Sequence, residues 1–180
     1  MHILFKDIFN KWDELNGDQE PFIVFLKKNK WKSLTRGFTF KRAFYKDNFV
    51  LKFDAGMKLD NNKKPYDGFE HSGKNGEKSH TASENRHWQR SKNIPHRAKY
   101  ICPTTAYHRG LLIQPLLKNV NPDMGTCEEK YLKIAIELRF SHFWHYGFLD
   151  GKVKWFDVDH LGENWTNWKL KKDKRLTKIK

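Results

Sequence analysis

The sequence predicts a mixed α+β fold, because segments with the periodicity of strands and segments with the periodicity of helices both occur along the chain. Residues 38–53, FTFKRAFYKDNFVLKF, alternate apolar and polar residues on both sides of a short polar break, as in two strands joined by a hairpin turn. In residues 143–159, two apolar runs flank Asp150-Gly151, a dipeptide typical of tight hairpins. Residues 127–140 carry two glutamates near their start and a broad apolar stripe, which indicates a helix.

The segment before the first hairpin is expected to hold two helices. Residues 3–16 place apolar side chains at helical spacings, and Gly17 is expected to end this helix. Residues 21–31 start with a proline and fit a short helix better than the alternative, a buried strand. The strand hairpin then follows at about residues 37–54.

Lys52 stands in the middle of the second strand of that hairpin. It shares a strand face with Val50 and lies opposite the row formed by Phe49, Leu51 and Phe53. A lysine in this position either extends along the apolar surface to reach solvent, which is the more common case, or directs its charge into a cleft. The residues alone leave both interpretations open.

A change of composition follows the hairpin. Residues 55–80 are rich in Gly, Lys, Asn and Asp without any periodicity, which predicts a long mobile loop. Thr81 and Glu84 then match a capping box, so a helix is expected to begin there and to continue to about Arg90. Ile94-Pro95 is expected to end it.

Two further strands are expected between the helices. Residues 99–107 and 111–117 are apolar and flank a turn at His108-Arg109-Gly110. Pro103 and Pro115 place these strands at edges or ends, because proline donates no backbone hydrogen bond. Together with the hairpin at about residues 37–54, these segments predict four strands in the N-terminal half of the chain.

The charge balance indicates the class of partner. The chain of 180 residues carries a formal net charge of +14, which favours nucleic acid, phosphates or an acidic protein surface. The basic C-terminal tail could contact such a partner, and its candidate residues are Lys171, Lys172, Lys174, Arg175 and Lys178.

Cysteine content and hydropathy bear on the location of the protein. Cys102 and Cys127 occur without a spacing typical of zinc sites or disulfide frameworks, so reduced thiols and a cytoplasmic protein are expected. No signal peptide is recognised, and the longest apolar run, Phe22 to Leu26, is too short to span a membrane.

Four segments in this order resemble a known family. They are Lys52 in FVLKF, Glu84 in TASENRHW, the segment LLIQPLL, and Asp157 in GFLDGKVKWFDVD. Their arrangement resembles the protein-kinase-like fold, and especially the shortened kinase-like proteins of bacteriophages. The likeness covers about residues 35–160. It implies a small kinase-like domain with a five-stranded antiparallel sheet in its N-terminal half, one pairing helix and a truncated helical lobe. This domain would lie between an N-terminal helical segment at 1–34 and a basic tail at 161–180.

The resemblance implies a nucleotide site. In kinases a strand lysine contacts the phosphates of ATP, a helix glutamate holds that lysine, and an aspartate holds magnesium. Lys52, Glu84 and Asp157 match these positions, so ATP and Mg are the implied cofactors. Gly37 lies in the segment that would cover the phosphates. The residues alone also permit simpler roles, with Glu84 as a capping-box partner and Asp157 as a polar strand end.

The resemblance also implies a loss of catalysis. Phe140 stands where kinases carry the aspartate that accepts the substrate proton, and His145 stands where they carry a metal-binding asparagine. A phenyl ring accepts no proton. The implied function is a catalytically defective kinase-like binding protein, a pseudokinase encoded by a phage that acts on a host protein or nucleoprotein.

Two alternatives belong to other functional classes. His160, followed by Asn164 and Asn167, is similar to the core of HNH nucleases, although no second histidine follows it. A basic nucleic-acid-binding module without enzyme activity is the other alternative. Its basis is three tryptophans that lie among lysines and could stack on bases, namely Trp155, Trp165 and Trp168. The structural interpretation of these tryptophans is that they fill a core.

Overall fold

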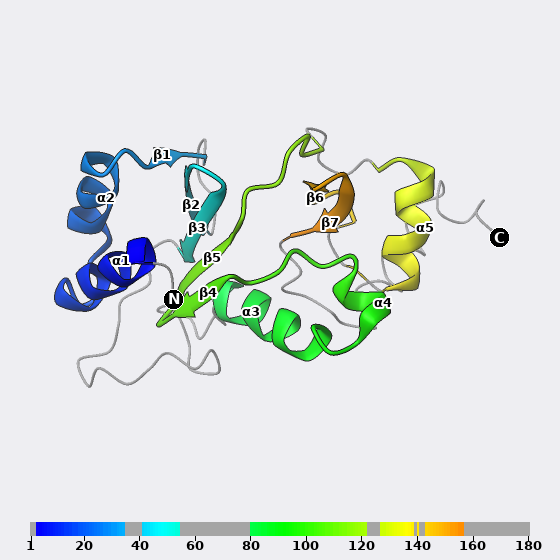
Figure 1. Cartoon of the computed structure of the whole chain (residues 1–180), viewed down its shortest axis with the longest axis horizontal. Helices are drawn as coiled ribbons and strands as arrows, with labels where there is room; N and C mark the ends of the chain where they lie inside the picture. Colours follow the sequence, from blue (N-terminus) through cyan, green and yellow to red (C-terminus); the bar gives the residue numbers. More distant parts are fainter. Residues whose placement is uncertain are drawn as a thin grey trace, which may run out of the picture. The chain divides into compact units, whose positions relative to one another are not determined.

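The computed structural model describes residues 3–34, 41–54, 80–121, 127–138, 140 and 143–156. Within these ranges the chain is α+β, which confirms the predicted fold class (Figure 1). It divides into two compact units, the first formed by Met1–Arg86 with Pro103–Leu116 and the second by His87–Cys102 with Leu117–Lys180. The described residues include no helix with the length and apolar character that a membrane span requires.

Two helices form the N-terminal segment. Helix α1 spans Ile3–Glu14, and Gly17 follows it with a φ of 72° while its N–H donates to the carbonyl of Trp12, as expected for a glycine at a helix end. Helix α2 spans Gln19–Lys28, so the helix interpretation of this stretch is confirmed. The Asp18 side chain caps its first turn.

The first unit contains the predicted five-stranded antiparallel sheet. The strands are β1 (Lys32–Ser33), β2 (Lys41–Lys46), β3 (Phe49–Asp54), β4 (Ala106–His108) and β5 (Leu111–Pro115). Their order is β1-β2-β3-β5-β4, and every neighbouring pair is antiparallel. Strand β3 therefore lies in the centre of the sheet, between its own hairpin partner and a strand that is distant in sequence.

The predicted strand at residues 99–107 is wrong for most of its length. Only Ala106–His108 pairs with β5, and Ile101 instead forms an isolated bridge with Trp155 in the second unit. Pro103 separates these two contacts, and a residue without an N–H cannot extend the ladder there.

One face of the sheet is buried against the two N-terminal helices. The register pairs Phe44 with Leu51 and Leu51 with Ile113, which places these side chains on one face. They share a core with Trp12 of α1 and Phe22 of α2, and the rings of these two residues lie 4.8 Å apart. Residues 3–34 thus belong to the same packed unit as the sheet.

Helix α3 spans His80–Ser91 and starts differently from the predicted capping box. Thr81, the predicted cap residue, lies inside the first turn, and its hydroxyl donates to the carbonyl of Gly110 at 2.9 Å. The backbone N–H of Thr81 donates to Oδ1 of Asp54 at 3.3 Å. The helix start is therefore satisfied by the end of β3, which no local sequence pattern reveals. A short helix, α4 (Pro95–Ala98), follows.

The second unit contains the predicted C-terminal helix and hairpin. Helix α5 spans Glu129–Glu137, and strands β6 (Tyr146–Leu149) and β7 (Lys152–Trp155) pair around a turn at Asp150-Gly151. Trp155 is fully buried at the centre of this unit. The buried residues around it are Ile101, Ala135, Leu138, Phe140 and Tyr146.

Candidate functional site

Lys52 lies at the centre of the sheet on the face opposite the apolar core. In the antiparallel register it stands between Ala43 of β2 and Leu112 of β5. Because side chains alternate along a strand, Lys52 points away from Leu51 and Phe53, which fill the core. The residue is only 7% exposed, so its ammonium group does not reach freely into solvent. Of the two interpretations of Lys52, the one with a buried charge applies.

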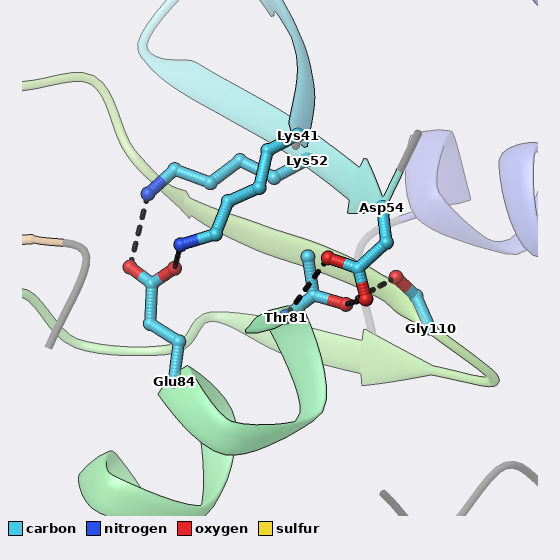
Figure 2. Close-up of polar contacts among 6 residues, drawn as sticks. All are labelled: Lys41, Lys52, Asp54, Thr81, Glu84 and Gly110. Atoms are coloured by element: carbon cyan, nitrogen blue, oxygen red, sulfur yellow. Dashed lines mark hydrogen bonds and ion pairs between the residues drawn. The ribbon is translucent and has the colours of Figure 1, made fainter. Parts of the chain in front are cut away.

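The partner of Lys52 is Glu84 on α3. The Nζ atom of Lys52 lies 2.9 Å from Oε1 of Glu84, and the side chains are 9% and 1% exposed (Figure 2). The ion pair that the resemblance implies is therefore present. Because charged groups are rarely buried unless they are paired, this contact explains how both side chains tolerate the interior.

Lys41 of β2 contacts the same carboxylate. Its Nζ atom lies 3.5 Å from Oε2 of Glu84, and its side chain is 13% exposed. Figure 2 shows both lysine side chains directed at the carboxylate from neighbouring strands. Sequence reasoning missed Lys41. Only the strand register of the structure reveals it, because Ala43 pairs with Lys52 and Lys41 lies two residues before Ala43 on the same face.

A second buried polar contact fixes the position of Glu84. Asp54 ends β3 and is 4% exposed, and its Oδ1 atom accepts a hydrogen bond from the backbone of Thr81 at the start of α3. Thr81 in turn donates to the β4–β5 turn at Gly110 (Figure 2). Glu84 follows Thr81 by three residues on the helix, so the contact that holds the helix start also sets the distance between Glu84 and β3.

These side chains suit anion binding better than acid–base chemistry. A lysine ammonium carries three N–H donors, so it can contact a carboxylate and a phosphate oxygen at the same time. Buried charged groups with specific partners are also enriched at functional sites. Among the residues that the structure describes, no group of three or more His, Cys, Asp or Glu side chains is arranged to hold a metal ion.

Several residues that the sequence singled out lie outside the described ranges. They are Gly37, Asp157, His160, Lys171, Lys172, Lys174, Arg175 and Lys178. Most of the predicted loop at residues 55–80 also lies outside these ranges. The roles of these residues in nucleotide, metal or partner binding stay predictions.

Phe140 is a core residue of the second unit. Its side chain is 3% exposed, and its ring centroid lies 5.4 Å from that of Trp155. Packing alone explains a phenyl ring at this position, and its assignment to the place of a kinase aspartate stays a prediction. The ring of His145 stacks on Phe156 at 5.4 Å, with an interplanar angle of 6°.

Trp155 does not form part of a base-stacking surface. It is fully buried, and its indole N–H donates to the carbonyl of Phe143 at 3.0 Å. The structural interpretation of this tryptophan, in which it fills a core, is therefore confirmed. Trp165 and Trp168 lie outside the described residues.

Comparison with known proteins adds no family to this description. No protein-family model, curated protein or solved structure matches the chain.

Proposed function

We propose that this chain is a kinase-like protein that binds the phosphates of ATP and acts through binding and not through phosphoryl transfer. The observation that carries the proposal is the buried contact between Nζ of Lys52 and Oε1 of Glu84, at 2.9 Å. Protein kinases use a lysine on the third strand of an antiparallel sheet and a glutamate on the following helix in this way. Here the lysine lies on β3 and the glutamate on α3, the next helix in the chain.

The energetics of the pair support a functional role. A buried ion pair adds little net stability compared with apolar residues of similar volume, because both charges lose their hydration. Lys52 nevertheless occupies a central strand between Ala43 and Leu112, where an apolar side chain would suit the sheet. Binding of a phosphate ligand would explain the buried ammonium group, since Glu84 would hold that group in a fixed position before the ligand binds.

The proposed cofactors are ATP and magnesium. Lys52 would contact the phosphates, and Asp157 would supply the carboxylate oxygen that magnesium prefers. Magnesium would neutralise charge on the phosphates when bound. The non-catalytic half of the proposal follows from Phe140, because a phenyl ring at the position of the kinase aspartate accepts no proton from a substrate hydroxyl.

The proposed partner is a host protein or nucleoprotein with an acidic surface. The net charge of +14 favours such a surface, and the basic residues near the C-terminus would contribute to the contact. The origin from a phage and the location in the host cytoplasm belong to the same proposal.

Calorimetric and thermal-shift titrations with ATP, with and without magnesium, test the proposal. ATP at about 100 times its Kd should stabilise the protein by about 2.7 kcal/mol and raise Tm by several degrees. Lys52→Met should lose this response. Lys27→Met, which removes an exposed charge on α2, should keep it.

Two controls make the result decisive. Circular dichroism of Lys52→Met and of Lys52→Arg, which keeps the positive charge, separates loss of binding from loss of folding. The absence of any ATP response in the unmodified protein at millimolar concentration would refute nucleotide binding. Phosphoryl transfer well above background, to the protein itself or to a partner, would refute the non-catalytic half.

A further inference from the structure

The strand register brings a second lysine to the site of Lys52. Strand β2 pairs with β3 so that Ala43 faces Lys52 and Lys41 faces Asp54. Side chains two residues apart share a face, so Lys41 and Lys52 both project to the α3 side of the sheet. Ala43 presents only a methyl group on this face, next to both lysines.

The carboxylate of Glu84 lies between the two ammonium groups. Oε1 is 2.9 Å from Nζ of Lys52, and Oε2 is 3.5 Å from Nζ of Lys41. A single rigid carboxylate thus holds both nitrogens near each other. These three side chains, two cations and one anion, carry a summed charge of one positive unit, with side-chain exposures of 13% for Lys41, 9% for Lys52 and 1% for Glu84.

Asp54 lies close to this cluster but is directed to the helix. Its Oδ1 atom accepts from the N–H of Thr81 at 3.3 Å, and its Oδ2 atom lies 3.5 Å from the Thr81 hydroxyl. The N-terminus of α3 is therefore occupied by a carboxylate of the protein itself.

We propose that Lys41 is a second phosphate-binding residue, and that the site takes the di- or triphosphate chain of a nucleotide in preference to a single phosphate. This inference rests on the proposed function and specifies its ligand. Lys41 and Lys52 contact neighbouring phosphate groups, while Glu84 holds each ammonium through one oxygen.

The chemistry of lysine supports this choice of ligand. An ammonium group acts as a compact point charge, whereas the planar fork of arginine suits two oxygens of one group. Two point charges on the two sides of one carboxylate match two charged groups that follow each other in a chain. A di- or triphosphate chain supplies a charged group for each lysine, whereas a monophosphate supplies one group that both lysines must share.

Isothermal titration with ATP, ADP, AMP and tripolyphosphate tests the inference on the full chain, both in EDTA and in magnesium. We expect tripolyphosphate to compete with ATP, and we expect AMP to bind at least tenfold more weakly than ADP. Lys41→Met should weaken ATP and tripolyphosphate binding at least tenfold and should change AMP binding less than twofold. Lys32→Met is the matched control, because Lys32 is exposed on β1 of the same sheet and should leave all affinities unchanged.

The outcomes separate this inference from the proposed function. Equal ATP affinity in the unmodified protein and in Lys41→Met, together with a loss in Lys52→Met, would overturn the role of Lys41 and leave the proposed function intact. Binding of tripolyphosphate without binding of adenine nucleotides would support the lysine pair and overturn the nucleotide assignment. No binding of any of these ligands would overturn both. Circular dichroism and urea unfolding of Lys41→Met test whether misfolding causes the loss, and a native spectrum with reduced affinity supports the role of Lys41.

Discussion

Removal of the negative charge from Glu84 is expected to destabilise the first unit strongly. The substitution Glu84→Gln keeps the shape of the side chain but leaves Lys52 and Lys41 without the carboxylate that lies 2.9 Å and 3.5 Å from their Nζ atoms. At an effective dielectric constant of about 20, each contact corresponds to about 5–6 kcal/mol of attraction. Burial of the neutral glutamine amide costs less hydration than burial of the carboxylate, and this difference offsets part of the loss. The expected net loss is about 3–5 kcal/mol, as for other broken buried ion pairs.

Urea unfolding followed by tryptophan fluorescence and circular dichroism measures this loss. In a chain of this size 1 kcal/mol corresponds to roughly 2–4 °C in Tm, so a decrease of about 6–20 °C is expected. Glu14→Gln is the matched control, because Glu14 forms a 2.7 Å ion pair with Lys11 while its side chain is 66% exposed. That substitution should cost under about 1 kcal/mol. Similar losses in the two variants would refute the argument from burial.

The two lysines provide a second check on the same reasoning. Lys41→Met or Lys52→Met alone leaves one ammonium beside the carboxylate, whereas the double variant leaves a buried carboxylate without either lysine. The double variant should therefore lose more stability than the sum of the single losses, by about 0.5–3 kcal/mol, as is typical of residues in one charge network. Additive losses would mean that the lysines do not share Glu84.

Two further predictions concern the second unit. Burial raises the pKa of Cys127 to about 12, with a smaller contribution from the nearby Glu128. This thiol should therefore react very slowly with Ellman's reagent at pH 8 in the folded protein and rapidly in urea. A fast reaction of the folded protein would contradict this prediction. Because the folded state keeps the thiol proton, the contribution of Cys127 to stability should be complete below about pH 9 and should fall as the pH rises toward about 12, a slope that Cys127→Ser should lack in urea unfolding. Gly147→Ala should lower the urea midpoint more than Gly151→Ala, because a Cβ at Gly147 would lie 2.9 Å from Cβ of Leu117 and 3.2 Å from the carbonyl oxygen of Lys118, whereas Gly151 has open space around it and only a positive φ of 74°. Equal urea midpoints for the two variants would contradict a steric clash at Gly147 and would mean that the backbone of β6 relaxes there.

Local patterns predicted most of the secondary structure. The first hairpin follows from period-two alternation, and the second follows from the Asp150-Gly151 dipeptide between apolar runs. The turn residues Asp47 and Asp150 adopt positive φ angles of 52° and 49°. The amphipathic helix at α1 and the helix at α5 follow from apolar spacing. These signals are local because the apolar residues that predict each helix or strand lie within that helix or strand.

The errors concern contacts between residues that are distant in sequence. The capping-box pattern at Thr81 failed because Asp54 satisfies the start of α3 from the end of a strand. The strand expected at 99–107 was too long because Ile101 pairs within the second unit. Neither partner lies within the short window that a sequence pattern covers.

The candidate site was partly predictable for the same reason. Lys52 is visible as a charge inside an apolar strand, and the resemblance supplied Glu84 as its partner. Lys41 carries no such signal, because it begins a strand where a lysine is unremarkable on a solvated face. Only the pairing of Ala43 with Lys52 places Lys41 beside Glu84, and register between strands is a tertiary property.

The central place of β3 has a consequence during synthesis on the ribosome. Its second neighbour is β5, in which Ile113 pairs with Leu51. Because β5 is synthesised much later than β3, one edge of the nascent hairpin stays unpaired for several seconds at translation speeds of about 5–20 residues per second. An open edge of this kind invites pairing with other chains, and an inward lysine is a known protection against such association. In the nascent chain, Lys52 therefore first reduces the association of this open strand edge with other chains. Its ion pair with Glu84 can form only after α3 has been synthesised.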